Sequence, residues 1–274
     1  MSLLFPVAAG FDLAAIDTSS TPGFSGDKKA AERELADSGG ELAGLQERLF
    51  AESKFGGTRS VLLVLQAMDT AGKGGIVRHV IGETDPQGIH LHAFKAPTEE
   101  ERSHDFLWRI RAELPQAGQI GVFDRSHYED VLIHRVRGFS TPDAIEERYG
   151  IINEFERELA DSGTTIIKVM LHISADEQRA RLQERLDRPD KHWKYNPGDV
   201  DERQSWDQYQ EAYQIALTRT STVDAPWYVI PADRKWYARW AVQHLLLEAL
   251  RRLDPQWPAV DYDIEAEKQR LAAT

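Results

Sequence analysis

The pattern of hydrophobic and polar residues alternates along the chain between short apolar runs and longer segments with helical spacing. The apolar runs predict strands near residues 60–66, 88–94, 119–123, 164–172 and 227–230. The helical spacing predicts helices near residues 27–50, 73–82, 98–113, 141–161, 174–186, 200–220 and 233–253. This alternation predicts an α/β fold, in which a parallel sheet carries helices on both faces.

Capping signals predict where two helices begin, and composition divides the chain into an N-terminal arm, a domain and a C-terminal tail. Thr141 precedes a proline, and Ser174 is followed three residues later by Glu177, so helices are expected to begin at both places. Residues 1–26 are of mixed character and are expected to form an N-terminal arm. We expect one domain over residues 27–253 and a C-terminal tail over residues 254–274.

A polar, basic segment interrupts the alternation at about residues 187–205. It lies between two predicted helices and contains two prolines. Its position is typical of a lid that closes over bound phosphates. The alternative is an ordinary ordered loop held in place by Trp193 and Tyr195.

The strand near 60–66 leads directly into the glycine-rich turn Gln66-Ala-Met-Asp-Thr-Ala-Gly-Lys-Gly-Gly75. Backbone N–H groups of such a turn, together with the following helix N-terminus, bind phosphate oxygens, and Lys73 adds a positive charge. Compared with the usual G-x-x-x-x-G-K-[ST] pattern, Ala67 replaces the first glycine and Gly74 replaces the hydroxyl that contacts Mg²⁺. Asp69 can supply an oxygen ligand instead. The alternative is a tight strand-to-helix turn with a surface lysine.

A second motif follows the strand near 119–123, which ends at Asp124 and continues into Arg125. A carboxylate at the end of a buried strand is where a P-loop protein places its metal ligand. Because the carboxyl ends of parallel strands face one crevice, Asp69 and Asp124 are expected to converge on one Mg²⁺. The guanidinium of Arg125 suits phosphate. Alternatively, Asp124 caps the next helix and Arg125 pairs with Glu129.

Composition narrows the possible chemistry. The chain has no cysteine, which excludes disulfides, thiolate metal sites and cysteine nucleophiles. A net charge of −12 argues against broad nucleic-acid binding, although a run of basic residues over 179–194 provides a local site for an anion. The chain start lacks the pattern of a signal peptide, and no apolar stretch approaches the length of a membrane span. His90 and His92 share one strand face, where a hydrogen-bonded pair is expected rather than a zinc site.

Taken together, the motifs resemble those of the family-2 polyphosphate kinases, which transfer phosphoryl groups between inorganic polyphosphate and nucleotides. The resemblance spans roughly residues 30 to 253. Its carriers are the glycine-rich turn at 66–75, Phe123-Asp-Arg-Ser-His-Tyr-Glu-Asp-Val131, Asp190-Lys-His-Trp-Lys-Tyr-Asn196 and Ala225-Pro-Trp-Tyr-Val-Ile-Pro-Ala-Asp-Arg-Lys-Trp-Tyr237. It implies a P-loop three-layer α/β/α sandwich with a helical lid, in a cytoplasmic homo-oligomer that is a dimer or a tetramer.

The resemblance also implies roles for individual residues. Asp69 and Asp124 are similar to the metal ligands, for Mg²⁺ or Mn²⁺, and Lys73 and Arg125 to catalytic cations. Further phosphate contacts are expected from Ala71, Gly72, Gly74, Gly75, Arg78, Arg185, Lys191 and Lys194. Glu129 and Arg135 are expected near the acceptor or a second metal ion.

The Ser-His-Tyr-Glu-Asp form at 126–130 is similar to the subgroup that phosphorylates both nucleoside mono- and diphosphates, here AMP, ADP or GDP. Two other functions remain open. An ATP-dependent nucleotide kinase would share the P-loop but would need a base pocket for ATP as donor. A non-catalytic nucleotide or polyphosphate sensor would need neither the paired carboxylates nor the lid cations. No nucleic-acid or membrane partner is expected.

Overall fold

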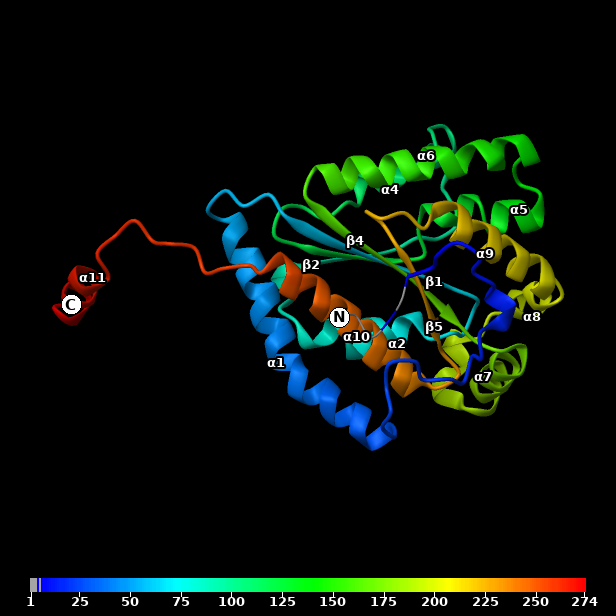
Figure 1. Cartoon of the computed structure of the whole chain (residues 1–274), viewed down its shortest axis with the longest axis horizontal. Helices are drawn as coiled ribbons and strands as arrows, with labels where there is room; N and C mark the ends of the chain where they lie inside the picture. The colour runs from blue at the N-terminus through cyan, green and yellow to red at the C-terminus, as the bar shows by residue number, and fades with distance from the viewer. Residues whose placement is uncertain (1–3, 5) are drawn as a thin grey trace.

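A five-stranded, fully parallel sheet forms the centre of the molecule (Figure 1). The computed structural model describes residue 4 and residues 6–274. The strand order is β2-β3-β1-β4-β5. The strands are β1 (Ser60–Ala67), β2 (Ile89–Ala93), β3 (Ile120–Asp124), β4 (Thr164–His172) and β5 (Trp227–Pro231). All five lie where the apolar runs predicted them, and every residue of β1 is buried, as expected for the central strand of a parallel sheet.

Helices cover both faces of the sheet, so the predicted three-layer α/β/α sandwich is confirmed (Figure 1). The α-helices are α1 (Lys28–Ser53), α2 (Lys73–His79), α3 (Glu99–Arg102), α4 (Trp108–Ala112), α5 (Ile133–Arg137), α6 (Pro142–Asp161), α7 (Ala175–Asp187), α8 (Gly198–Arg203), α9 (Trp206–Thr220), α10 (Lys235–Leu253) and α11 (Ile264–Ala272). Short 3₁₀ turns include His127–Asp130 and Pro189–Lys194.

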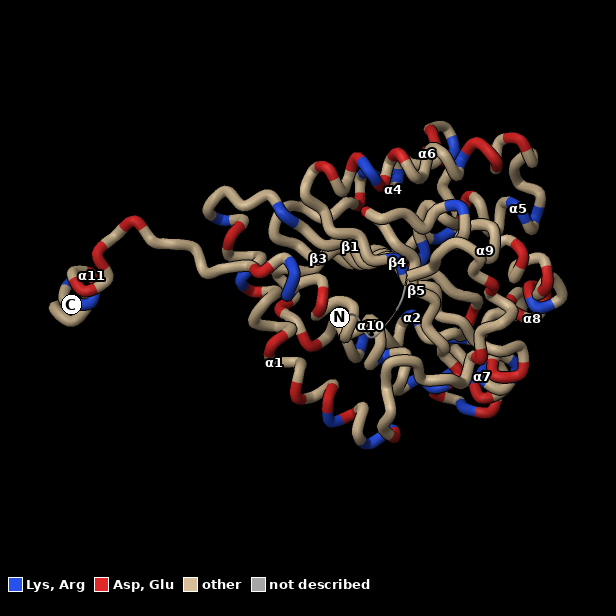
Figure 2. Tube along the Cα trace, viewed as in Figure 1, with Lys and Arg blue, Asp and Glu red and all other residues tan. Residues whose placement is uncertain are grey.

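Two hydrophobic clusters lie on opposite faces of the sheet. On one face α1, α2 and α10 pack against β1 and β4 through residues such as Leu42, Leu63 and Leu246. On the other face α6 and α9 pack through residues that include Phe155 and Leu217. Each fully buried leucine contributes about 1.5–3 kcal/mol relative to exposure. Figure 2 shows the charged residues mainly on the helices and loops and the sheet almost free of them.

The helical pattern was wrong about continuity in three places. The helix predicted over 98–113 is two short helices, because the Asp105 side chain accepts the N–H of Leu107 and starts a new turn. The helix predicted over 200–220 breaks between α8 and α9 at residues 204 and 205. The helix predicted over 73–82 ends at His79 and continues as a 3₁₀ turn. Amphipathic spacing persisted through each break and therefore could not reveal it.

The N-terminal arm and the C-terminal tail differ in their contacts with the body of the protein. The described part of the N-terminal arm lies against the body, where the Val7 N–H donates to the Trp227 carbonyl (2.8 Å) and Thr18 Oγ1 to Asp233 (2.7 Å). The C-terminal tail, predicted without a helix, contains α11 and extends away from the body (Figure 1). Among the described residues, no helix combines the length and the apolar character needed to cross a bilayer.

A buried polar network lies between β4 and α6. Lys168 Nζ donates to Glu156 Oε2 (2.5 Å), to the Thr220 carbonyl (2.6 Å) and to the Tyr128 hydroxyl (2.9 Å). Glu156 Oε1 also accepts from Tyr128 and contacts His127 Nε2 (2.8 and 3.2 Å). The network thereby fixes the 3₁₀ turn that follows Arg125.

Candidate active site

The glycine-rich turn forms a phosphate-binding loop between β1 and α2. Gly72 precedes the first residue of α2 and has φ +123°, a conformation that side-chain-bearing residues rarely adopt. Arg181 of α7 is almost fully buried and donates to the carbonyls of Thr70 (3.1 Å) and Ala71 (2.8 Å). Gln178 of α7 donates to the Asp69 carbonyl (3.1 Å). Side chains of α7 therefore hold the loop in its conformation through hydrogen bonds to its backbone carbonyls.

Lys73 opens α2 and extends back toward the strand ends. Its side chain is mostly buried, with Nζ 3.4 Å from the Ala67 carbonyl and 3.9 Å from Asp124 Oδ1. β1 and β3 are neighbours, and Leu65 pairs with Asp124 in the sheet register. The two sequence motifs therefore meet at one edge of the sheet, as the sequence predicted.

Arg125 lies among carboxylates. Its guanidinium donates to Asp69 Oδ1 (2.9 Å), and its Nε lies 4.0 Å from Glu129 Oε2. Burial would lower the pKa of Arg125, but Glu129, Asp69 and Asp124 raise it overall. Arg125 has φ +65°, a strained conformation for a non-glycine residue. The pair of Arg125 with Glu129, an alternative that the sequence left open, is therefore present, but Arg125 lies closer to Asp69. The next turn is capped by Ser126, not by Asp124.

Glu129 faces the same crevice from the turn after β3. In the amide orientation that satisfies both of its polar atoms, Gln66 donates to Glu129 Oε1 (3.0 Å) and accepts from Ser126. Burial raises the pKa of Glu129 above its usual value, despite Arg125 and Lys73. The carboxylate is thus held in place by β1, and it takes up a proton more readily than an exposed glutamate.

The carboxylates of Asp124 and Asp69 are candidate ligands for a metal ion. Asp124 Oδ1 is buried and has no hydrogen-bond partner among the described residues. Within that same part of the chain, no group of three or more His, Asp or Glu side chains could hold an ion alone. Mg²⁺ usually takes one or two carboxylates and completes its shell with water and substrate phosphates. Asp124, with Asp69 nearby at the next strand end, fits that requirement.

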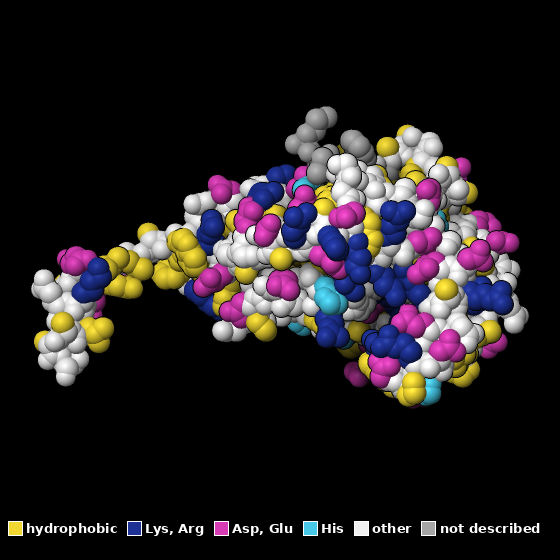
Figure 3. Space-filling view, turned by 90° about the horizontal axis from the view of Figure 1, so that it is seen from below, with side chains coloured by type: hydrophobic (Ala, Val, Ile, Leu, Met, Phe, Trp, Pro, Cys, Tyr) yellow, Lys and Arg dark blue, Asp and Glu magenta, His cyan; other side chains and the backbone are white. Residues whose placement is uncertain are grey.

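A cavity of about 560 Å³ opens beside these groups. Asp69, Arg125 and Glu129 form one wall, and Tyr209 and Tyr213 of α9 form part of another. Its remaining charged lining includes Lys95, Arg102, Arg109, Arg137, Asp199 and Glu202. Figure 3 shows Lys and Arg side chains gathered around a hollow on one face of the molecule. The cavity combines cations with aromatic walls, which suits a ligand that has both phosphates and a ring.

The lid segment (residues 187–205) borders this cavity through Asn196, Gly198, Asp199 and Glu202. Arg185, at the end of α7, donates to Asp199 Oδ2 (3.1 Å). The side-chain ammonium groups of the lid lysines (Lys191 and Lys194) lie beside lid neighbours: that of Lys191 is 3.8 Å from Asp190, and that of Lys194 lies over the Trp193 ring at 4.9 Å. Burial and Asp69 raise the pKa of Asp199. The segment therefore borders the cavity, whereas its two lysines are not among the residues that line it.

The remaining candidates lie further out. Arg78 is exposed in the last turn of α2. Arg135 pairs with Glu211 of α9 at 3.4 Å and does not line the cavity described above. His90 Nε2 and His92 Nδ1 lie 2.9 and 3.0 Å from the same Glu113 oxygen, so the two histidines share one carboxylate.

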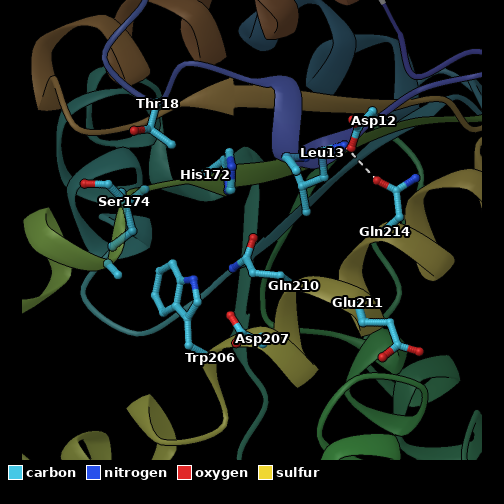
Figure 4. A pocket seen from close by; sticks show the side chains of 13 residues that line it. Asp12, Leu13, Thr18, His172, Ser174, Trp206, Asp207, Gln210, Glu211 and Gln214 are labelled. Carbon is cyan, nitrogen blue, oxygen red and sulfur yellow. Dashed lines mark hydrogen bonds between the residues drawn. The ribbon is translucent and has the colours of Figure 1, made fainter.

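A second cavity, of about 460 Å³, lies between the N-terminal arm and α9 (Figure 4). The Leu13 N–H donates to Gln214 Oε1 (2.7 Å) and ties the arm to this wall. Asp12, Asp207 and Glu211 line it, and among the described residues that line it there is no Lys or Arg. Its charge therefore disfavours a polyanion.

Comparison with known proteins decides the family. The sequence profile of polyphosphate kinase 2 matches residues 25–258. The chain belongs to the polyphosphate kinase 2 family. The expected family and the expected class of enzyme, a phosphotransferase of the polyphosphate kinase type, are thereby confirmed.

Relatives and solved structures agree with this membership. A relative from Meiothermus ruber, named AMP/ADP-polyphosphate phosphotransferase, is 50% identical over 248 residues, which cover 90% of this chain and 91% of the relative. An ADP-polyphosphate phosphotransferase from Rhodopseudomonas palustris is 42% identical and covers 79% of this chain and 78% of its own. The crystal structure of polyphosphate kinase 2 from Arthrobacter aurescens TC1 has a TM-score of 0.96 and 58% identity, covering 98% of this chain and 95% of that one.

Several residues at this candidate site were not predicted as site residues from the sequence. Arg109 is buried, donates to the Lys95 carbonyl (2.8 Å) and lies 3.7 Å from Asp130. In the sequence, Tyr209 and Tyr213 occupy ordinary amphipathic positions on a helix, and this pattern does not indicate a place in a ligand site. Arg181 belonged to the basic run, but nothing in the sequence showed that it points at the P-loop.

Proposed function

We propose that this protein transfers phosphoryl groups between inorganic polyphosphate and nucleotides, and that it accepts both AMP and ADP. The observation that carries the proposal is the convergence of Lys73, Asp124, Asp69 and Arg125 beside one aromatic-walled cavity. The names of the relatives from Meiothermus ruber and Rhodopseudomonas palustris support polyphosphate as one substrate and a nucleotide as the other.

Binding is the main contribution of these residues. Phosphoryl transfer needs positioning and charge neutralisation more than covalent chemistry by the protein. The N–H groups of the loop that includes Ala71, Gly72, Gly74 and Gly75 would hold phosphate oxygens at the α2 N-terminus. Lys73 and Arg125 would stabilise the charge that spreads over the transferred group. Arg185 and the lid lysines would meet the polymer when the lid segment closes.

The reaction exchanges one P–O bond for another. An oxygen of the acceptor phosphate attacks the terminal phosphorus of polyphosphate, and the bond from that phosphorus to the bridging oxygen breaks. The shortened polyphosphate leaves with the electron pair. Because the attacking oxygen is already anionic, no side chain needs to remove a proton from it. Covalent attachment of the phosphoryl group to a histidine is therefore not part of this proposal.

Asp69 and Asp124 would hold Mg²⁺ or Mn²⁺, which neutralises phosphate charge when bound. The buried Oδ1 of Asp124, which accepts no hydrogen bond from the described residues, supports this assignment. Glu129 would help to place the acceptor or a second metal ion, because it lies beside Arg125 and lines the cavity. Arg135 is proposed in the same role, although Glu211 now pairs with it.

The cavity accommodates the whole acceptor. Its volume of about 560 Å³ lies within the range of ordinary ligand pockets, roughly 300–1,000 Å³. The aromatic side chains of Tyr209 and Tyr213 offer surfaces for the base, while Arg125 and Arg137 offer charge for its phosphates.

A homo-oligomer and a cytoplasmic location, both expected from the sequence, stay predictions.

A matrix of donors and acceptors tests this proposal. Purified protein is incubated with Mg²⁺ and either polyphosphate or ATP as donor, against AMP, ADP and GDP free of other nucleotides. Formation of ADP from AMP and of ATP from ADP with polyphosphate alone is the expected result. Turnover with ATP but not polyphosphate would instead identify an ATP-dependent kinase, and binding without turnover would identify a sensor. ADP turnover without AMP turnover would contradict the dual acceptor range.

A further inference from the structure

The second cavity, of about 460 Å³, has no role in the proposed function, because none of the described residues that line it was assigned to phosphoryl transfer. Its walls come from three parts of the chain: the N-terminal arm, the end of β4 with the start of α7, and the first half of α9 (Figure 4). Gln214 of α9 fixes the arm, since it accepts the N–H of Leu13 (2.7 Å) and donates to the Phe11 carbonyl (2.9 Å). The cavity therefore has the fixed walls and the volume of an ordinary ligand pocket.

His172 is a buried polar side chain in this wall that lacks a partner. It is only 7% exposed, and its Nδ1 has no hydrogen-bond partner in the part of the chain that the structure describes. Burial lowers the pKa of His172 to about 4, despite the opposing effect of Asp233, so the imidazole is neutral at pH 7. The Nε2 of Gln210, another lining residue, is likewise buried and unpartnered there. Buried polar groups are nearly always hydrogen-bonded, so both side chains point to a ligand that supplies the missing bonds.

The charge of the walls selects a cationic ligand. Asp12, Asp207 and Glu211 contribute three carboxylates. Arg135 lies 3.4 Å from Glu211 outside the lining, whereas Asp12 and Asp207 form no ion pair with the described residues. The indole of Trp206 also lines the cavity (Figure 4), and an aromatic ring attracts an organic cation. A metal ion fits less well, because no group of three His, Asp or Glu side chains within the described residues could hold one.

The cavity also lies at both ends of the segment that carries the lid. α7 begins at Ala175 and α9 begins at Trp206, and both residues line the cavity. Between them, Arg203 of α8 donates to the Ala175 carbonyl (2.9 Å) and to Gln178 Oε1 (2.7 Å). Gln178 in turn donates to the Asp69 carbonyl of the P-loop (3.1 Å). A ligand in the cavity would therefore contact the two points from which the lid segment is held.

We propose that the second cavity binds a small organic ammonium ligand that carries a hydroxyl group, and that this ligand changes the affinity for polyphosphate through the lid. Asp207 and Glu211 are four residues apart, share one face of α9 and would attract the ammonium group. The hydroxyl can donate to His172 and accept from Gln210. The binding site is independent of the proposed function, whereas the effect on polyphosphate rests on it.

Binding is measured without substrates by saturation-transfer NMR. The probes are choline and ethanolamine, which are quaternary and primary forms of this chemistry, and the neutral control is dimethylbutanol, the uncharged carbon analogue of choline. The cavity variant is Asp207→Asn/Glu211→Gln. Its matched control is Asp143→Asn/Glu147→Gln, which removes two carboxylates at the same spacing from the first turns of α6, outside both cavities.

The intact protein and the matched control should bind at least one ammonium probe, and should bind it more tightly than dimethylbutanol. The cavity variant should bind that probe about tenfold more weakly, as expected for the loss of two partly exposed ion pairs. His172→Phe keeps a ring of similar shape but lacks the nitrogens, and it should also weaken binding. Circular dichroism of each variant separates loss of binding from loss of folding.

The effect on the lid is read from the KM for polyphosphate with and without the bound probe. A change of about fivefold or more is expected in the intact protein and the matched control, and none in the cavity variant. The cavity variant thereby also corrects for any association of the probe with polyphosphate itself. The KM is meaningful only if polyphosphate is a substrate, whereas the NMR measurement holds whatever the reaction.

The proposed site is overturned if neither ammonium probe binds at about 10 mM, or if dimethylbutanol binds as tightly as choline. It is also overturned if the folded cavity variant keeps the affinity of the intact protein. Binding at the cavity with an unchanged KM for polyphosphate would overturn the link to the lid.

Discussion

Replacing Lys168 with methionine would expose the energetics of the buried network that supports Arg125. Lys168 is fully buried, and its ammonium donates to Glu156, Thr220 and Tyr128. Methionine fills most of the same volume but leaves the Glu156 carboxylate buried without its cation. Breaking a buried pair in this way costs about 3–5 kcal/mol. We therefore expect Lys168→Met to lose that amount of unfolding free energy at pH 7.

The double variant Lys168→Met/Glu156→Gln tests whether the loss comes from the unpaired charge. It removes both charges, and the new amide can still bond His127 and Tyr128. The double variant should be more stable than Lys168→Met by about 2 kcal/mol or more. Urea unfolding of the wild type, both single variants and the double variant supplies the full cycle. A Lys168→Met loss below about 1 kcal/mol, or a double-variant loss equal to the sum of the single losses, would refute this reasoning.

The same variant should change the pH dependence of stability. Burial would raise the pKa of Glu156, but Lys168 and His127 lower it overall below 4.5. A lowered pKa means that the wild-type carboxylate contributes stability above pH 4.5, which is lost as the pH falls through the native value. In Lys168→Met burial should dominate and raise that pKa. The destabilisation relative to wild type should therefore be smaller at pH 5 than at pH 8.

The remaining predictions concern the active site. Asp69→Asn and Asp124→Asn should each nearly abolish transfer at saturating Mg²⁺ in a folded protein, and near-normal turnover in either would remove the two-carboxylate site. Lys73→Ala should lower kcat/KM sharply, whereas alanine at both lid lysines should mainly raise the KM for polyphosphate; an unchanged KM would exclude the lid from the polymer path. Glu129→Gln should lower AMP turnover relative to ADP turnover. Because burial raises the pKa of the Glu129 carboxyl above 4.5, the same variant should also remove the loss of activity at acidic pH. An unchanged acceptor ratio and an unchanged pH profile would mean that Glu129 has no part in the reaction.

The central strands β3, β1 and β4 were predictable because they are buried on both faces. Burial of every residue in β1 leaves a continuous apolar run, which the sequence displays directly. The placement of Asp69 and Asp124 followed from the same rule, since parallel strands end at one edge. Helix breaks were less visible, because the loop at Asp105 is made by one hydrogen bond and not by a change in the apolar spacing.

The cavity walls could not be predicted from local patterns. Tyr213 lies on α9, about 90 positions after Arg125, and only the tertiary fold brings them to one cavity. Asp199 was part of a segment predicted as a lid, but its approach to Asp69 depends on how α7 and α8 are packed. α11 escaped notice because only two of its residues, Ile264 and Leu271, mark its apolar face.

If the proposed function holds, the charges of the site imply that metal and phosphate stabilise each other's binding. Asp69, Glu129 and Asp199 lie near Arg125, and burial raises the pKa of the latter two carboxyls. A polyanion alone would meet these carboxylates and be repelled, while a cation alone would compete with Arg125 for Asp69. A cation bound with phosphate relieves both conflicts, because it neutralises the carboxylates and frees Arg125 for a phosphate oxygen. Linkage then requires that each ligand raise the affinity for the other by the same factor. The arrangement therefore favours binding of nucleotide or polyphosphate together with the metal over binding of either one first.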